Sequence, residues 1–278
     1  MYDVKFISNK GQITLGTNGI VADFDFGESV SVNIGTSQGF GQVGVTKETE
    51  SVGERIINVK GVCYGDVPQK KKLMRKMFAP FTSGKLIMGD YEIQVTVKEP
   101  PAFPTVKNSG NFMMQLIAPY PFFRSSERKT VLLGEIKPMF KFPINYKTPH
   151  SFGEKSKGKT LQVYNDSDVS IPFSLDIVFY EESSMITISE LKTFKKLKIT
   201  GNYSAGDVIK LYRDFRQIMH CELIQGSKVT DILDRITDDS DLFKLEVGDN
   251  LFTATDNGNM NFTVYLGYQQ EVVALYED

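Results

Sequence analysis

Apolar and polar residues alternate one by one along much of this chain. In the stretch YEIQVTV, Tyr91–Val97, every second residue is apolar, and the alternation recurs in Ile171–Phe179 and Phe262–Leu266. A period of two places one set of side chains on each face of an extended strand, so half-buried β-strands are predicted here. Pairs of adjacent residues that tolerate a positive φ predict turns between the strands. These residue pairs are Asn18-Gly19, Ser83-Gly84, Gly201-Asn202, Gly248-Asp249 and Asn257-Gly258. The chain is predicted to be mainly β.

One helix interrupts this pattern. Asp66 is suited to cap its start, Pro68 fits its first turn and Pro80 forces its end. Its apolar residues follow the spacing of one helical face, predicted to pack on a sheet; they are Leu73, Met74, Met77, Phe78 and Phe81. A second, shorter helix is expected over Lys228–Ile236, where Val229, Ile232, Leu233 and Ile236 share a face.

Glycine and proline positions indicate how the chain is divided. Four glycines between Gly35 and Gly44 favour a flexible β-hairpin, or arm, extending to about Glu50. Prolines at 100, 101 and 104 are interpreted as a crossing between strands, and those at 119 and 121 as the end of a first domain. We expect domains at residues 1–128 and 129–278.

Composition excludes several classes of function. The 278 residues are 41% apolar and 24% charged, enough for one or two hydrophobic cores. A net charge of -2 provides no field that would attract nucleic acid or an anionic membrane. No apolar run reaches the roughly 18 residues of a membrane helix, and the N-terminus lacks the core of a secretory signal. We therefore expect no sequence-specific nucleic-acid binding, no membrane insertion and no export by that route.

The cysteines and histidines do not form a recognisable catalytic or metal site. Cys63 and Cys221 lie far apart in the sequence, which favours free, partly buried thiols in a reducing compartment. His220 precedes Cys221, but neighbours on a strand point to opposite faces and cannot serve as a nucleophile and its base. A zinc site would need these residues and His150 to converge without CxxC or HxxxH spacing. We predict no catalytic, cofactor-binding or metal-binding residue.

Charged and glycine-rich clusters favour structural interpretations as well. An acidic group lacks the spacing of a calcium loop and offers no definable glycosidase pair, so turn caps and solvated loops are expected; it comprises Asp231, Asp234, Asp238, Asp239, Asp241, Asp249 and Asn250. Glu181 and Glu182 are expected to mark the exposed end of a strand. A basic helix face is interpreted as solvated; it carries Lys70, Lys71, Lys72, Arg75 and Lys76. Gly39 and Gly41 lack the third glycine of a nucleotide loop.

An ordered series of phrases resembles a known family. The phrases are Gly53-Glu54-Arg55-Ile56-Ile57, the early helix, Ser83-Gly84-Lys85-Leu86, Ala118-Pro119-Tyr120-Pro121-Phe122, Asn165-Asp166-Ser167-Asp168-Val169, Thr200-Gly201-Asn202-Tyr203 and Asp239-Ser240-Asp241-Leu242-Phe243. In this order they resemble the distal tail (Dit) proteins of long-tailed, siphovirus-type bacteriophages, which are components of the tail baseplate hub. The resemblance covers most of the chain.

The resemblance implies a fold and a role. The fold would be an N-terminal β-sandwich or barrel with one short helix and a hairpin arm, followed by a C-terminal galectin-like β-sandwich. The role would be a non-enzymatic virion protein, assembled in the bacterial cytoplasm, that forms a ring, commonly a hexamer, at the distal end of the tail tube. Its implied partners are further copies of itself, the major tail tube protein, the tail-associated tip protein and receptor-binding or other baseplate proteins.

Two alternatives remain open at this point. A carbohydrate-binding adhesin would use the C-terminal sandwich, with Tyr203, Tyr212 or Tyr265 as stacking platforms for host glycans. A Trp-based platform is excluded because the chain has no Trp. A hydrolase would need convergent acids or an activated nucleophile, which the sequence does not provide.

Overall fold

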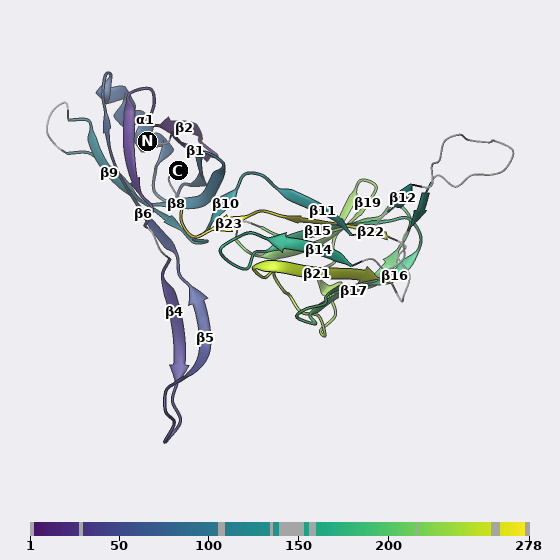
Figure 1. Ribbon diagram of the computed structural model, residues 1–278. Coiled ribbons are helices and arrows are strands. Elements are labelled where there is room, and N and C mark those ends of the chain that lie inside the picture. The colour runs from purple at the N-terminus through teal and green to yellow at the C-terminus, as the bar shows by residue number, and fades with distance from the viewer. Residues whose placement is uncertain are drawn as a thin grey trace. The chain divides into compact units, whose positions relative to one another are not determined.

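The protein is built almost entirely of β-strands, as the alternation predicts. A computed structural model describes residues 3–27, 30–104, 109–133, 136–138, 153–155, 160–214, 216–256 and 262–275; for 136–138 and 153–155 it describes the backbone alone. The chain divides into two compact units, unit 1 (Met1–Glu127 and Glu271–Asp278) and unit 2 (Arg128–Gln270) (Figure 1). The expected division at 128 and 129 ended the second domain at 278, whereas the structure places residues 271–275 with unit 1.

Unit 1 is one hydrogen-bonded sheet with a helix on its core side. The main strand order is β2-β1-β7-β8-β9-β6-β3, and β10 pairs with β8 and β23. The elements are β1 (Val4–Ser8), β2 (Gly11–Leu15), β3 (Ile20–Asp25), β6 (Arg55–Cys63), α1 (Val67–Met77), β7 (Ser83–Met88), β8 (Tyr91–Ala102), β9 (Asn111–Ala118), β10 (Phe123–Ser125) and β23 (Glu271–Val272). Inward-facing residues of these strands and of α1 form one buried core.

Helix α1 begins and ends where the sequence predicts. The Asp66 side chain accepts a hydrogen bond from Gln69 N at 3.2 Å, which caps the first turn. Met74, Met77 and Phe78 are buried, and the Phe78 ring stacks on Phe6 with centroids 4.6 Å apart. The prediction was wrong for Leu73 and Phe81, which are 42% and 87% exposed. The helix buries a narrower arc than the spacing suggested, and Phe81 lies beyond its end.

Two glycines predicted to form turns lie inside strands instead. Gly84 belongs to β7 and has no positive φ; a Cβ there would lie 2.5 Å from Ile7 O and against the Phe6 ring. Gly201 lies in β17 (Lys196–Tyr203) beside the Tyr203 hydroxyl, and it does have a positive φ, of 153°. Both glycines therefore permit close packing. Asn18, Gly19 and Gly248 do have positive φ, as predicted, whereas Asn257-Gly258 lies outside the described residues.

The first proline pair does not separate two strands. β8 continues through Pro100 and Pro101 to Ala102, and its pairing with β9 shifts register between Val97 and Glu99 and again between Glu99 and Ala102. A shift of register leaves backbone groups unpaired, so Pro, which has no N–H, is tolerated there.

The glycine-rich arm is a two-stranded ribbon, as predicted. β4 (Val32–Ser37) pairs with β5 (Thr46–Val52) in antiparallel fashion (Figure 1). The ribbon extends the β3–β6 hairpin, because the chain passes from the end of β3 into β4 and from the end of β5 into β6. Gly53 N donates to Ser31 O at 2.9 Å and closes the base of the ribbon.

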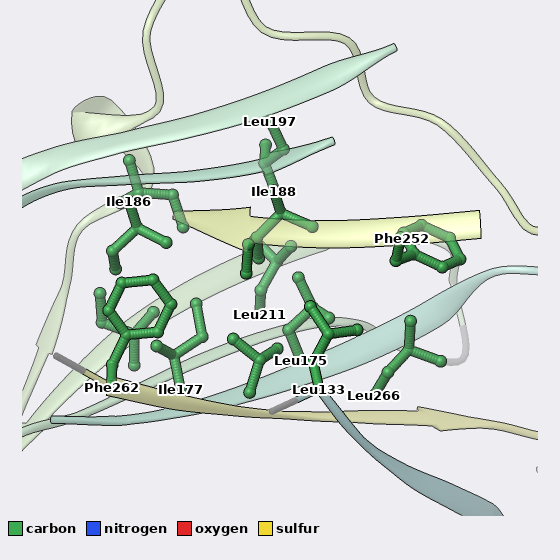
Figure 2. Close-up of a cluster of buried hydrophobic side chains, with 14 of the residues drawn as sticks. Leu133, Leu175, Ile177, Ile186, Ile188, Leu197, Leu211, Phe252, Phe262 and Leu266 are labelled. Atoms are coloured by element: carbon green, nitrogen blue, oxygen red, sulfur yellow. The ribbon is translucent and has the colours of Figure 1, made fainter. Parts of the chain in front are cut away.

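Unit 2 is a β-sandwich of a larger and a smaller sheet. The larger sheet has the order β11-β22-β15-β18-β19-β20 and the smaller sheet β14-β21-β16-β17. The strands are β11 (Lys129–Leu133), β12 (Ile136–Pro138), β13 (Gly153–Lys155), β14 (Leu161–Asn165), β15 (Phe173–Phe179), β16 (Ser183–Glu190), β17 (Lys196–Tyr203), β18 (Val208–Arg213), β19 (Met219–Gln225), β20 (Lys228–Asp231), β21 (Gly248–Thr255) and β22 (Phe262–Tyr268), with β12 paired to β13. Figure 2 shows side chains of both sheets, Ile186 and Ile188 facing Ile177 and Leu175, in the shared core.

The expected helix over Lys228–Ile236 does not form. Lys228–Asp231 is the edge strand β20, joined to β19 by a turn in which Gly226 has a φ of 60°, and only Leu233–Arg235 makes a 3-10 turn. Pairing with β19 satisfies the β20 backbone, and Ile232 N donates to Cys221 O. Tertiary pairing therefore overrides a short helical pattern.

Candidate interaction surfaces

The arm is the most exposed part of unit 1. Between residues 31 and 52, every residue except Gly35 is exposed. Its apolar side chains are exposed as well; they are Val32 (58%), Ile34 (58%), Phe40 (111%), Val43 (100%), Val45 (59%) and Val52 (45%). An isolated two-stranded ribbon has little stability in water, and its unpaired strand edges can bind another chain. The arm is therefore a surface that favours contact with another molecule.

Arg55 joins the base of the arm to the rest of unit 1. Its side chain is buried, and its guanidinium donates to four carbonyl oxygens: Phe26 at 2.7 Å, Gly27 at 2.8 Å, Pro121 at 2.7 Å and Val273 at 2.5 Å. It also lies 4.8 Å from the centroid of the Phe123 ring. Burial lowers the pKa of Arg55, but the ordinary value is so high that the cation persists. One side chain thus ties the arm base to the segment that directly follows β23 (Glu271–Val272).

A second polar cluster fixes the returning strand β23. Glu271 is 1% exposed, and its carboxylate accepts hydrogen bonds from Arg124 and from the Tyr120 hydroxyl. Burial, and then the charge of Glu271, raises the pKa of Tyr120, so its hydroxyl stays protonated and donates. The cluster holds β23 against β10, where the chain returns from unit 2.

His220 and Cys221 do not form a catalytic pair. They are neighbours on β19; Cys221 lies in the core, and His220 stacks on Tyr212 with its Nε2 3.5 Å from Asp214. Burial, and then the charge of Asp231, raises the pKa of Cys221 to about 12. Cys63 and Cys221 are both buried and free, whereas His150 lies outside the described residues. Within the described ranges, no three His, Cys, Asp or Glu side chains gather where they could hold a metal.

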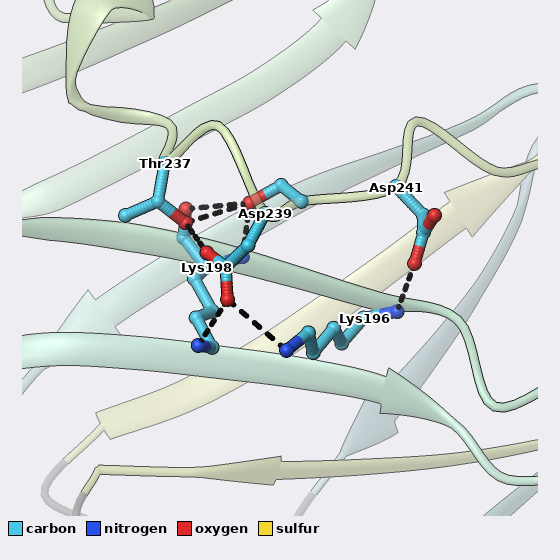
Figure 3. Close-up of polar contacts among 6 residues, drawn as sticks. Lys196, Lys198, Thr237, Asp239 and Asp241 are labelled. Carbon is cyan, nitrogen blue, oxygen red and sulfur yellow. Dashed lines mark hydrogen bonds and ion pairs between the residues drawn. The ribbon is translucent and has the colours of Figure 1, made fainter.

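The acidic group caps turns and pairs with lysines. Asp239 accepts hydrogen bonds from Lys198, Lys196 and Thr237, and Asp241 accepts one from Lys196 N (Figure 3). The Lys198 contact, followed by those of Thr237 and Lys196, holds the pKa of Asp239 well below its ordinary value. The remaining members have separate surroundings. The Asp231 side chain accepts from Leu233 N, and that of Asp249 accepts from Gln162. Asn250 is buried and its side chain bonds the Glu246 backbone, while Asp234 and Asp238 are exposed. Glu181 and Glu182 are exposed after β15.

The tyrosines proposed as glycan platforms are not equally available. Tyr203 is 2% exposed, stacks on Phe179 and donates to Thr200 O, so the platform role was wrong for this residue. One face of the Tyr212 ring is covered by His220. Tyr265 is 38% exposed, on another strand of the larger sheet.

The basic helix face and the arm glycines have local roles. Lys70 donates to Tyr64 O, and Lys71 and Arg75 lie over the Phe103 ring at 5.2 Å and 5.3 Å from its centroid. Gly39 and Gly41 lie at the tip of the arm, where Gly39 N donates to the Gln42 side chain. Among the described residues, no helix has the length and apolar character to cross a membrane.

Sequence reasoning did not assign a role to Arg55 or Glu271. Arg55 lies in a phrase that carries the family resemblance, but its carbonyl partners come from three separate segments. Glu271 ends a stretch with no distinctive local pattern. The only sequence signal would be an isolated charge beside a predicted strand, which is common on protein surfaces.

Comparison with known proteins gives a clear fold assignment. No protein-family model and no curated protein matches the chain. The crystal structure of the Dit protein (gp 19.1) of phage SPP1, described as a paradigm of the hub adsorption apparatus in phages that infect Gram-positive bacteria, matches with a TM-score of 0.67 and 12% identity, covering 98% of this chain and 99% of that chain. The chain has the Dit fold. At this identity the likeness establishes the fold, and function has to be argued separately.

Two structures of the phage p2 baseplate in its activated conformation, one with Sr and one with Ca, also match. Their identity is 9% over 96% of this chain and 98% of the other, with TM-scores of 0.48 and 0.49. These scores are too low to add to the argument. The Dit fold assignment therefore rests on the SPP1 protein.

Proposed function

We propose that this chain is a structural, non-enzymatic component of a phage tail. It forms a ring, hexameric in the simplest case, at the distal end of the tail tube and acts as a baseplate hub. The hub joins the tube to the tail-associated tip protein and to receptor-binding proteins, and it assembles in the host cytoplasm before joining the virion.

The observation that carries this proposal is the extent of the fold likeness. It spans 98% of this chain and 99% of the SPP1 Dit protein, so both units and their order correspond. A shared fold alone does not determine function. The fold likeness becomes a stronger argument for a structural role when the reactive side chains of the chain favour no catalytic chemistry.

That inventory supports a structural role. The described His and Cys neighbours lie on opposite faces of β19, and the Cys221 thiol is buried with a raised pKa. Within the acidic group, Asp231 caps a turn and Asp239 pairs with two lysines. These arrangements stabilise the fold and leave the exposed surfaces to binding.

The arm supplies a feature that assembly would use. Its exposed apolar residues have no partner elsewhere among the described strands, since β4 and β5 pair only with each other. A neighbouring subunit would satisfy both the strand edges and the apolar side chains. In a ring, the arm of each subunit would contact the next subunit. The same head-to-tail contact would then repeat around the ring until it closes.

The test is the assembly state of the full chain. We would measure the mass by light scattering after size-exclusion chromatography, over a wide concentration range and with tail partners co-expressed. Negative-stain imaging of the same samples would show the shape of the particles. We expect ring-shaped particles with a central hole. A variant in which residues 31–52 are replaced by a short turn is expected to stay folded and to lose the ring, while Glu48→Ala, at an exposed arm position, keeps it. A monodisperse monomer under all of these conditions would overturn the proposal.

A further inference from the structure

The outward face of the unit 1 sheet contains a groove with acidic walls. Its volume is about 460 Å³, and it lies over β3, β6, β9 and β8. Cross-strand pairing aligns Asp25 with Asn58, Asn58 with Gln115 and Gln115 with Glu99, which makes one row across all four strands. The row therefore begins and ends with a carboxylate.

The next row adds a further carboxylate and an apolar floor. Asp23 pairs with Lys60, and Lys60 with Met113, which is 59% exposed. The groove thus has three carboxylates, Asp23, Asp25 and Glu99, against one cation, Lys60. All four of these charged residues are exposed. Its acidic excess and its exposed methionine favour a partner that is both basic and partly apolar.

Helix α1 presents such a surface. Lys72, Arg75 and Lys76 are exposed and one turn apart, and the helix carries no acidic residue in its first turn. Beside them lies Leu73, which is 42% exposed. The combination of cations around an exposed leucine is complementary to carboxylates around an exposed methionine.

The dimensions of the two surfaces also agree. Asp25 and Glu99 are separated by three strand spacings, roughly 14 Å, and a helix with its side chains is about 10 to 12 Å wide. Asp23 and Asp25 lie two residues apart on β3, roughly 7 Å, while Lys72 and Lys76, at i and i+4, lie about 6 Å apart. A helix fits between the acidic walls with its cations near both.

One chain cannot make this contact with itself. Met74, Met77 and Phe78 bury α1 in the core with Val59 and Met114, whereas Asn58, Lys60 and Met113 alternate with those core residues and face outward. The helix and the groove thus lie on opposite faces of one sheet. Contacts between two unlike patches on different copies are head-to-tail, and they form a closed ring when the rotation between neighbouring copies closes.

We infer that the acidic groove receives the basic face of α1 from a second copy of this chain. This inference rests on the proposed function and adds to it the surfaces that meet at each ring junction. Single exposed ion pairs contribute little to binding. A network of charges around a Leu73–Met113 contact contributes more, because the apolar contact excludes water from the pairs.

The experiment is charge reversal with rescue, in the full chain. The groove variant is Asp23→Lys with Glu99→Lys, and the helix variant is Lys72→Glu with Lys76→Glu. Each is expected to raise the concentration at which rings dissociate by roughly tenfold or more, while their co-expressed mixture or the fourfold variant recovers most of the loss. Glu127→Lys is the matched control and is expected to leave the ring unchanged, because Glu127 is exposed in unit 1 and belongs to neither the groove nor α1.

The outcomes separate the inference from the proposed function. Rings weakened by either reversal, restored by their combination and weakened by added salt, would support it. Wild-type rings that neither reversal changes, or that the combination fails to restore, would overturn the groove contact and leave the hub proposal intact. A wild type that never forms rings, even with tail partners, would overturn both. Circular dichroism of each variant establishes that it is folded.

Discussion

Arg124 and Glu271 lie directly opposite each other on β10 and β23 and form an ion pair at 2.8 Å, although 147 residues separate them in the sequence. The Glu271 side chain is 1% exposed and that of Arg124 25%. The pair therefore fixes a long-range strand contact in unit 1. The Glu271 carboxylate is almost completely buried, and it accepts hydrogen bonds from this partner and from Tyr120.

Replacing the buried acid is expected to destabilise unit 1. Glu271→Gln keeps the shape of the side chain but removes the charge opposite Arg124, and we expect a loss of about 2 kcal/mol in the free energy of unfolding. Urea denaturation followed by circular dichroism measures it. Glu50→Gln, in the exposed Lys47–Glu50 pair, is the control, with an expected change below about 0.5 kcal/mol. Equal effects for the two variants would contradict the prediction.

Arg55→Lys tests the anchor of the arm. Lysine has three donors on one nitrogen and cannot reach carbonyl groups on different segments as the guanidinium fork does. We expect a loss of about 3 kcal/mol and faster amide hydrogen exchange at residues 30–34, next to the arm base. The control is Arg128→Lys, since Arg128 is exposed. Unchanged exchange in the Arg55 variant would show that the arm base is held by other contacts.

Phe81→Gly is expected to be tolerated despite the loss of a large apolar side chain. Phe81 has a φ of 60° and is 87% exposed, so the ring contributes little burial while the backbone is strained. The free energy of unfolding should stay unchanged or rise by about 1 kcal/mol. Phe78→Ala, in the core, should lose about 3 to 5 kcal/mol. A large loss for the Phe81 variant would mean that its ring packs in solution.

The stability of unit 2 should depend on Glu190 at acid pH. Burial alone would raise the pKa of Glu190, but hydrogen bonds from Leu251 N and from Thr193 outweigh it and hold the pKa below its ordinary value. A lowered folded pKa gives stability that is complete above the unfolded value of about 4.3 and is lost as pH falls through the folded value.

Thermal unfolding between neutral pH and the acid range measures this contribution. Glu190→Gln removes it, so the Tm of this variant should fall less with acidification than that of the wild type. Glu181→Gln, at an exposed position after β15, should follow the wild type. Parallel pH profiles for all three proteins would exclude the proposed role of Glu190.

Sequence patterns predicted the strands and the helix whose formation depends on contacts between residues close in the sequence. The alternation in Tyr91–Val97 found β8 because one face of that strand is buried, and Asp66 with Pro68 located the start of α1 because capping is a local contact. The glycine-rich arm was found for the same reason. Features that depend on distant partners were missed, such as β20, which forms only because β19 lies beside it.

The interaction surfaces were the least predictable part. Phe81 was expected in the core because its helical spacing is right, yet the helix ends before it. The acidic walls of the groove come from strands β3 and β8, whose residues Asp25 and Glu99 are aligned only by the intervening pairs. No sequence pattern at either position indicates that register.

The chain enters unit 2 after Glu127 and leaves it at Gln270, and the strands that flank these points, β10 and β23, are hydrogen-bonded to each other. A tensile force on unit 2 is therefore divided between two covalent connections that share one anchorage. Separating either connection from unit 1 requires breaking the β10–β23 strand pair and the Arg124–Glu271 ion pair together. The β10–β23 pair thus brings both covalent connections of unit 2 to a single point of unit 1.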